Sequence, residues 1–314
     1  VFHRGVKASP RDFLRAVGRF RDDLVVGAEC MFAWYWLADL CVKEEIEFVL
    51  GHALYMRAIH GGKTKNDPID SGKISRLLRG GMFPIAYVYP RPMRATRDLL
   101  RRRGYLVRRR SELVAHITNT HSQYNVTPPP GKLSYAANRT DVAESFADPS
   151  VRRMLQVDVN LAGHFDKEIR ELELYLTRHA KIHDPNTFYR LKSVPGIGKV
   201  LALTMMYEIH DIGRFPSVGK FLSYCRLVRG KHTSNGKSYG SPGKKIGNPH
   251  LKWAFSEIVP LIKRQSPEIK KYCDRIEKKH SKARAHSQLA VKLGRAVYFM
   301  LKRKEAFDLK RIAR

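Results

Sequence analysis

Residues 24–50 read LVVGAECMFAWYWLADLCVKEEIEFVL, and this stretch decides the first part of the fold. The apolar run at residues 24–29 predicts a buried strand, residues 30–45 a helix, and residues 46–50 a second strand. Strands separated by a helix-length segment favour a parallel pair joined by a right-handed crossover. A further helix is expected to open at Asp67. The first part of the chain is therefore predicted to be α/β, with strand ends along one sheet edge, where ligand sites collect.

The arginine-rich segment that follows has a different character. Between Arg91 and Arg110 there are nine arginines and one acid, and the apolar residues keep a helical rhythm as far as Ile117, which predicts a long basic helix. Residues 150–181 predict a second long helix after a proline-rich loop. Together they predict an antiparallel, coiled-coil-like hairpin. The chain thus divides into an α/β part (1–90), a basic hairpin (91–185) and an all-α C-terminal domain (186–314).

The charge and composition limit the class of protein. The chain has 314 residues, a formal charge of +30 and 43% hydrophobic residues, so it can bury a core and is not wholly disordered. Its four cysteines form no close pair, which argues against a disulfide scaffold or structural zinc and fits a reducing compartment. Glu29 and Asp39 interrupt the longest apolar stretch, so no membrane partner is expected. Nucleic acid is the commonest partner of so basic a chain.

Three acids form a candidate metal site. Glu29 ends the first apolar strand, and Asp67 and Asp70 are three residues apart at a helix start, so both can face the same direction. The structural alternative makes Glu29 a solvent-facing strand end and Asp67, which precedes a proline, a helix N-cap. In the functional interpretation they hold one or two Mg²⁺ ions, which prefer oxygen ligands and assist phosphodiester transfer. Lys63 and Lys65 beside them could hold a nucleic-acid backbone.

Two segments of the C-terminal third also carry candidate chemistry. Residues 193–209 read SVPGIGKVLALTMMYEI and predict a helix, a PGIG turn and a helix, whose amides can face a phosphate or form an ordinary turn. Residues 231–253 form a loop with Ser234, Ser238 and Ser241 among glycines and lysines. From the residues alone this loop could be solvated, grip phosphate or carry a nucleophile. No Ser-His-Asp spacing is present that would identify an activated serine, so the three alternatives stay open.

The predicted nucleic-acid contacts come from these basic and glycine-rich segments. They are Lys63, Lys65, Arg101, Arg102, Arg103, Arg108, Arg109, Gly196, Gly198, Lys199, Lys231, Lys237, Lys244 and Lys245. Affinity for such a partner should fall steeply with salt, because each neutralised phosphate releases counterions.

The order of the motifs resembles the insertion sequence 110 family of transposases. The motifs are GAE at 27–29, KNDPID at 65–70, SVPGIG at 193–198, DIGRFPSVGKFLSYCRL at 211–227 and KKIGNPHLKW at 244–253. The resemblance covers about residues 5–302. It implies a RuvC-like, RNase H-like domain with an Asp-Glu-Asp-Asp metal site, joined to a helical C-terminal domain with a catalytic serine. The PGIG segment is then helix-hairpin-helix-like.

The resemblance also assigns roles residue by residue. Glu29 matches the family's strand-end glutamate, and Asp67 and Asp70 match its closing aspartate pair. The family's first aspartate would lie on a strand before Val1, so the chain is expected to lack its extreme N-terminus. Ser234 matches the catalytic serine; this chain has Ser-Asn-Gly where close relatives have Ser-Gly, so a one-residue shift would favour Ser238 instead.

The implied activity is that of a transposase, a DNA recombinase that cuts and rejoins strands through a phosphoserine intermediate with Mg²⁺. Its expected partners are DNA at the element ends and target, a structured guide RNA and further copies in a tetramer. The expected location is the cytoplasm of a bacterium or archaeon, at the nucleoid. Two alternatives remain open: a hydrolytic RuvC-like nuclease, and a decayed, non-catalytic nucleic-acid-binding remnant.

Overall fold

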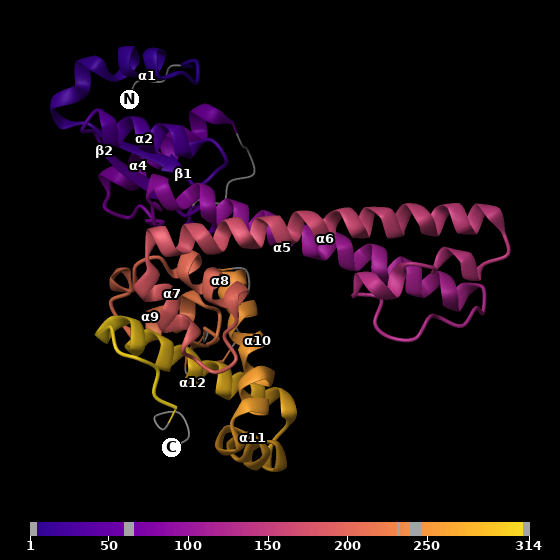
Figure 1. Ribbon diagram of the computed structural model, residues 1–314. Helices are drawn as coiled ribbons and strands as arrows, with labels where there is room; N and C mark the ends of the chain where they lie inside the picture. The colour runs from indigo at the N-terminus through magenta and orange to yellow at the C-terminus, as the bar shows by residue number, and fades with distance from the viewer. Residues whose placement is uncertain (1–4, 60–65, 231–232, 236, 239–245, 310–314) are drawn as a thin grey trace. The chain divides into compact units, whose positions relative to one another are not determined.

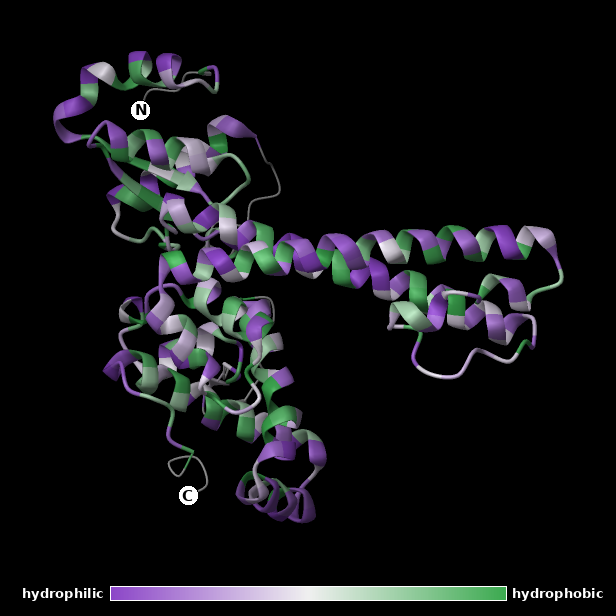
Figure 2. Cartoon of the chain, in the orientation of Figure 1, coloured by the Kyte–Doolittle hydropathy of each residue, from purple (hydrophilic) through white to green (hydrophobic). Residues whose placement is uncertain are grey.

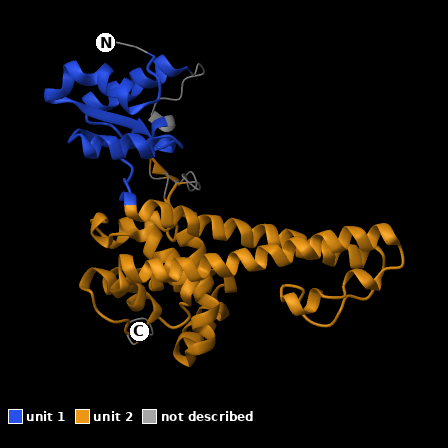
Figure 3. Ribbon diagram, turned by 45° about the horizontal axis from the view of Figure 1, so that its top comes forward, with its two compact units in different colours: residues 1–91 blue, residues 92–314 orange. Residues whose placement is uncertain are grey.

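The computed structural model describes residues 5–59, 66–230, 233–235, 237–238 and 246–309. The chain divides into two compact units, residues 1–91 and 92–314 (Figure 3). The described part is mostly helical with one small parallel sheet, which agrees with the predicted mixture of α/β and all-α parts. The division into three parts stays a prediction, and the last two of them form one compact unit. In the described part, no helix combines the length and the hydropathy needed to cross a membrane.

The first unit is built around two parallel strands. Its elements are α1 Pro10–Val17, the 3-10 helix η1 Gly18–Asp23, β1 Val25–Glu29, α2 Trp34–Lys43, β2 Glu47–Gly51, α3 Ala53–Ile59 and α4 Asp67–Arg79. Val26 pairs with Phe48 and Glu29 pairs with Gly51 across the two strands. The predicted parallel pair with a helical crossover is confirmed, although α2 begins four residues later than expected. The identity of this unit as an RNase H-like domain stays a prediction.

Alternation along β1 places the helices of this unit on different faces of the strand. Val26 belongs to an apolar cluster with Cys41 of α2, and Ala28 packs against a cluster that contains Trp34 and Ala38 of α2. Gly27, which points the other way, lies beneath α4: a Cβ at Gly27 would be 2.3 Å from a methyl group of Leu78. The glycine of the GAE motif therefore lets α4 approach the strand that ends in Glu29.

The second unit begins with the predicted hairpin, formed by α5 (Arg91–Gln123) and α6 (Pro149–His183) (Figure 1). Two ion pairs, Arg103 with Glu173 and Arg110 with Asp166, join the two helices, and His116 forms a hydrogen bond with Asp158. The residue numbers of successive partners rise along α5 and fall along α6, so the two helices are antiparallel. Figure 2 shows hydrophilic residues along both helices, interrupted by short hydrophobic stretches.

The connection between these helices folds back on the hairpin and closes a small second core. It contains the 3-10 helices η2 Ala136–Arg139 and η3 Ala143–Ser145. Leu133 and Phe146 from the connection pack with Ile117 of α5 and Leu155 of α6. Arg139 is 2% exposed; it pairs with Asp166 and donates to the carbonyl of Leu133. Only a proline-rich loop was predicted for this segment.

The largest core lies at the other end of the hairpin. It joins α5 and α6 to α7 Pro185–Lys192, α8 Lys199–Ile209, the 3-10 helix η4 Ile212–Arg214, α9 Val218–Tyr224, α10 Pro249–Gln265, α11 Pro267–Lys279 and α12 Lys282–Arg303. Helix α8 is central, because residues 201–209 are all buried. Between α9 and α10, the strands β3 (Thr233–Ser234) and β4 (Lys237–Ser238) form a short antiparallel hairpin in the predicted loop.

Candidate functional site

The candidate nucleophile Ser234 is an exposed residue at the tip of a β-hairpin. It ends β3 and pairs across the hairpin with Lys237, the first residue of β4. Asn235 has φ of 48°, the left-handed conformation that two-residue Asn-Gly turns require. Asn235 therefore has a structural role, because it lies in the turn that follows Ser234. Lys237 is exposed and lies beside Ser234 on the neighbouring strand.

The two ends of the serine loop are fastened to each other. The Asn248 amide N–H donates to the carbonyl of Tyr224 at 2.6 Å, and Arg226 Nε donates to the carbonyl of Ile246 at 2.9 Å. Gly247 has φ of 89°, and a Cβ there would be 2.6 Å from the Tyr224 carbonyl oxygen. This close approach requires glycine. The loop therefore leaves and re-enters the helical core at one fixed point.

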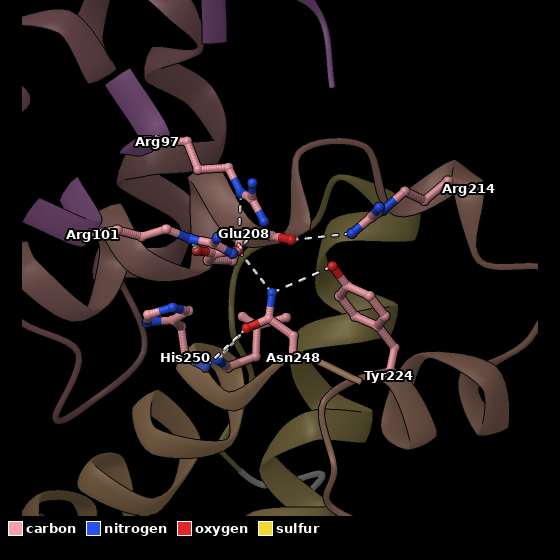
Figure 4. Close-up of polar contacts among 8 residues, drawn as sticks. Arg97, Arg101, Glu208, Arg214, Tyr224, Asn248 and His250 are labelled. Carbon is pink, nitrogen blue, oxygen red and sulfur yellow. Dashed lines mark hydrogen bonds and ion pairs between the residues drawn. The ribbon is translucent and has the colours of Figure 1, made fainter. Parts of the chain in front are cut away.

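That fixed point rests on a buried carboxylate, Glu208 of α8, which is 1% exposed (Figure 4). Arg97 Nη2 and Arg101 Nη2 of α5 donate to Glu208 Oε2 at 2.8 and 3.0 Å, and Arg101 Nε donates to Oε1 at 2.7 Å. Asn248 Nδ2 donates to Oε2 at 2.7 Å. Asn248 Oδ1 in turn accepts the amide N–H groups of His250 and Leu251, which caps α10. One carboxylate thus joins the basic helix, the central helix and the end of the serine loop.

The electrostatics of this cluster favour the ionised glutamate. Burial by itself raises the pKa of the Glu208 carboxyl, but hydrogen bonds and positive charge from Arg101 and Arg97, with a further hydrogen bond from Asn248, lower it to about 2. Burial lowers the pKa of the nearby His250, and Arg101 and Arg97 lower it further. At neutral pH the cluster therefore consists of two guanidinium groups, one carboxylate and a neutral imidazole.

The three predicted metal ligands lie in the first unit. Glu29 is the half-buried end of β1, and Asp67 and Asp70 lie in the first turn of α4, where Asp70 is 3.7 Å from the ammonium group of Lys73. The N-cap is Asn66, whose side chain accepts the Ile69 amide N–H, so the expectation that Asp67 caps this helix is wrong. Within the described residues, no group of three or more acids, histidines or cysteines is arranged to hold an ion. The metal site stays a prediction.

The structure divides the predicted basic contacts into two sets. Arg101 pairs with Glu208 and Arg103 pairs with Glu173, and their contact with nucleic acid stays a prediction. The other described basic residues are exposed, with Arg109 near Glu112, and are available to a phosphate: Arg102, Arg108, Arg109, Lys199 and Lys237. The remaining predicted lysines lie outside the described residues: Lys63, Lys65, Lys231, Lys244 and Lys245.

The PGIG turn joins α7 to α8 as predicted, but its two glycines have different surroundings. Gly196 has φ of 88°, and a Cβ there would be 3.0 Å from the Ile262 backbone nitrogen and the Leu261 side chain of α10. The close approach that Gly196 permits is to α10, and its contact with a phosphate stays a prediction. Gly198, at the N-terminus of α8, is exposed, and a Cβ there would meet nothing within 4 Å. A phosphate contact at Gly198 and Lys199 stays a prediction.

These surroundings predict opposite effects of two alanine substitutions. Gly196→Ala should lower the free energy of unfolding by about 2 kcal/mol, because a left-handed residue with a side chain is strained and α10 must move. Gly198→Ala, with φ of −79°, is the matched control and should lower it by less than about 1 kcal/mol. Urea unfolding followed by circular dichroism measures both. If Gly196→Ala keeps its stability but loses DNA affinity, the result would contradict the stability prediction and support a phosphate contact at Gly196.

The residues that fasten the loop were not predicted from the sequence. Glu208 is the one acid in LALTMMYEI, residues 201–209, and a single acid in an apolar helix requires a buried partner. This pattern could have predicted a buried ion pair at Glu208, and the arginine-rich segment contains candidate partners of opposite charge. Nothing in the sequence singled out Arg97 or Asn248 as those partners.

Comparison with known proteins bears on the part of the chain that contains this loop. Residues 189–274 match the model of a family described as the transposase IS116/IS110/IS902 family. This segment is therefore similar to the transposase domain of that family. The match contains Glu208, Ser234 and Asn248, and it confirms the resemblance to insertion sequence 110 transposases.

A second comparison supports the same resemblance over a longer stretch of the chain. The chain is similar to the transposase for insertion sequence element IS1111A of Coxiella burnetii (strain RSA 493 / Nine Mile phase I). The two are 23% identical over 216 residues, which is 67% of this chain and 59% of the relative. The alignment thus spans less than two thirds of the relative's length.

Proposed function

We propose that the chain is a DNA transposase that cuts and rejoins DNA strands through a covalent link to Ser234. The observation that carries this proposal is the loop of the transposase domain, in which a hairpin presents Ser234 opposite Lys237 above a base fastened to Glu208. A nucleophile on a loop needs a rigid support, because small misplacements are costly to the reaction rate. The network around Glu208 fastens the two ends of the loop that carries Ser234.

The proposed step exchanges one phosphate ester for another. The Ser234 oxygen attacks the phosphorus of a backbone phosphodiester and loses its proton, while the bond to one deoxyribose oxygen breaks and that oxygen leaves as a hydroxyl. A phosphoserine ester and a free strand end result, and attack by the hydroxyl of another strand reverses the exchange and joins the strands. The Lys237 ammonium group, on the neighbouring strand, would stabilise the negative charge on the phosphate.

Magnesium remains part of the proposal through Glu29, Asp67 and Asp70. Their oxygens are the ligands that Mg²⁺ prefers, and a bound ion would stabilise attacking and leaving oxygens. Because the described residues include no assembled group of three such ligands, no step of the exchange is assigned to an ion. In this proposal the acids act on DNA bound to the chain.

The proposed partners follow from charge. A formal charge of +30 suits a protein that holds DNA at element ends and targets together with a structured guide RNA. On α5, Arg102, Arg108 and Arg109 are exposed and can face a phosphate backbone. We include a homotetramer in the proposal, in which serine and acids from different copies act on one DNA.

The acids provide the test that separates this proposal from a binding-only protein. Asp67→Asn and Asp70→Asn should each lower adduct formation and strand joining by about 100-fold or more, with DNA affinity retained, because carboxylate charge is required for metal binding. The measurements are gel assays of labelled element-end DNA with Mg²⁺. Asp22→Asn, an exposed acid of the same unit, is the control and should retain activity. Unchanged activity in both active-site variants would remove the acids from the mechanism.

A further inference from the structure

Helix α11 carries both acids and bases, but the structure uses its acids internally. Lys263 of α10 donates to Glu277 at 2.9 Å and lies 3.0 Å from Asp274. Its pKa is raised by these two partners, so the ammonium group stays charged. Two of the three acids of α11 are therefore neutralised by a lysine of the adjacent helix.

The outward face of α11 is exposed and mostly basic, with one exposed acid, Glu268, at its N-terminal end. Lys271, Arg275 and Lys278 follow one another at spacings of four and three residues, so they share one face of the helix. Ile269 and Cys273, which are buried, mark the face that turns inward. Lys282 and Arg284, at the start of α12, are exposed and extend the charge. These five residues, Lys271, Arg275, Lys278, Lys282 and Arg284, are called the basic stripe below.

The composition of the stripe indicates what it binds. Its side chains are flexible cations, which neutralise phosphates without reading bases. Every residue of α11 and of the first turn of α12 is described, and none of the exposed ones is Phe, Tyr or Trp. Tyr272 is half-buried and its ring is covered by two cations, the Lys292 ammonium group 4.2 Å and the Arg275 guanidinium group 5.8 Å from the ring centroid. Unpaired strands are bound through stacking on such rings, so their absence from the exposed surface favours a paired backbone.

The length of the stripe also fits a backbone. With a rise of about 1.5 Å per residue, Lys271 and Lys278 are separated by about 10 Å along the helix axis. One strand of a duplex advances about 3.4 Å per nucleotide, so three cations on this face can reach about three successive phosphates. The stripe is remote in sequence from Ser234 and from the predicted contacts on α5.

We propose that the basic stripe on α11 and α12 binds the phosphate backbone of double-stranded DNA. The choice of DNA rests on the proposed transposase function, whereas the preference for a duplex rests on the missing aromatic residues. The stripe would hold DNA beside the transposase domain without regard to sequence, and the serine loop would act on the strand so held.

The test is the salt dependence of binding. The triple variant Lys271→Gln, Arg275→Gln, Lys278→Gln is compared with the unchanged full chain on a 30-base-pair DNA duplex at several salt concentrations. The slope of log K against log salt should become less steep by about 2.7, because each lost contact contributes about 0.9. Since all three side chains are exposed, the thermal unfolding curve should not change.

Two further variants make the result specific. Lys167→Gln, Arg170→Gln, Lys181→Gln removes the same charge from exposed positions of α6 and should change the slope by less than about 1. The swap Lys271→Arg, Arg275→Lys, Lys278→Arg keeps the charge and should keep the slope. Equal slope changes in both glutamine variants, or no change in either, would overturn the proposal. So would a larger affinity loss for an RNA duplex of the same length, which would make the stripe an RNA surface.

The outcome can be separated from that of the proposed function. If the unchanged chain forms no adduct, but the salt dependence of binding becomes less steep in the stripe variant, the transposase mechanism fails and the backbone contact stands. If the unchanged chain forms the adduct while the stripe variant binds duplex DNA as before, the stripe fails and the mechanism stands.

Discussion

Ser234→Ala should abolish the covalent protein–DNA adduct and should leave the affinity for the same DNA nearly unchanged. The substitution removes the proposed attacking oxygen and nothing from the core, because Ser234 is an exposed residue of a short hairpin. Exposed substitutions away from caps and strained positions change stability by at most about 0.5 kcal/mol. End-labelled DNA that stays with the protein in a denaturing gel measures the adduct, and a native gel shift measures the affinity.

Two other serines serve as controls. Ser238→Ala tests the one-residue shift, because Ser238 lies in β4 of the same hairpin, across from Thr233. Ser287→Ala removes an exposed hydroxyl from α12 and should leave the adduct unchanged. An adduct that persists in Ser234→Ala and disappears in Ser238→Ala would transfer the role of nucleophile to Ser238. Cleavage without any adduct, reduced but not lost in Ser234→Ala, would instead indicate a hydrolytic nuclease that uses water.

Features that depend on local patterns could be predicted from the sequence. The strands that end in Glu29 and Gly51, the two long helices and the turn at Gly196 follow from hydrophobic periodicity, glycine and proline. The hairpin at Ser234 had a local signal too, because Asn-Gly between two short polar segments favours a two-residue turn. In the sequence that dipeptide suggested a shifted alignment, whereas in the structure Asn235 has the left-handed conformation of a turn residue.

Features that depend on tertiary packing could not be predicted. Arg97 and Arg101 are more than 100 residues from Glu208 in sequence, and nine arginines compete for that carboxylate. The partner of Gly196 is likewise a helix that follows it by more than 60 residues. Asn66 and Asp67 are both good N-cap residues, so the sequence cannot choose between neighbouring helix starts. The serine loop could therefore be found in the sequence, whereas the groups that fasten it could not.

Glu208→Gln should lower the free energy of unfolding by about 3–5 kcal/mol at pH 7. The substitution leaves the guanidinium groups of Arg97 and Arg101 in a buried cluster without their carboxylate, and breaking a buried charge pair by removing one partner costs about that much. The matched control is Glu112→Gln on α5, whose exposed pair with Arg109 is screened by solvent, so this variant should unfold like the unchanged chain. Urea unfolding followed by far-ultraviolet circular dichroism measures both variants against the unchanged chain.

The difference in the free energy of unfolding between the unchanged chain and Glu208→Gln should depend on pH, and this dependence tests whether the stabilisation by Glu208 is electrostatic. The pKa of Glu208 is about 2 in the folded chain and near its ordinary value of 4.5 when unfolded, so the unfolded state binds the proton first as the pH falls. The stabilisation is thus fully present above about pH 4.5 and is lost as the pH falls toward 2. The shift corresponds to about 3 kcal/mol in total, and the difference between the unchanged chain and Glu208→Gln should be about 2 kcal/mol smaller at pH 3 than at pH 7. A difference that stays constant from pH 7 to pH 3 would mean that shape, and not charge, holds the base of the serine loop.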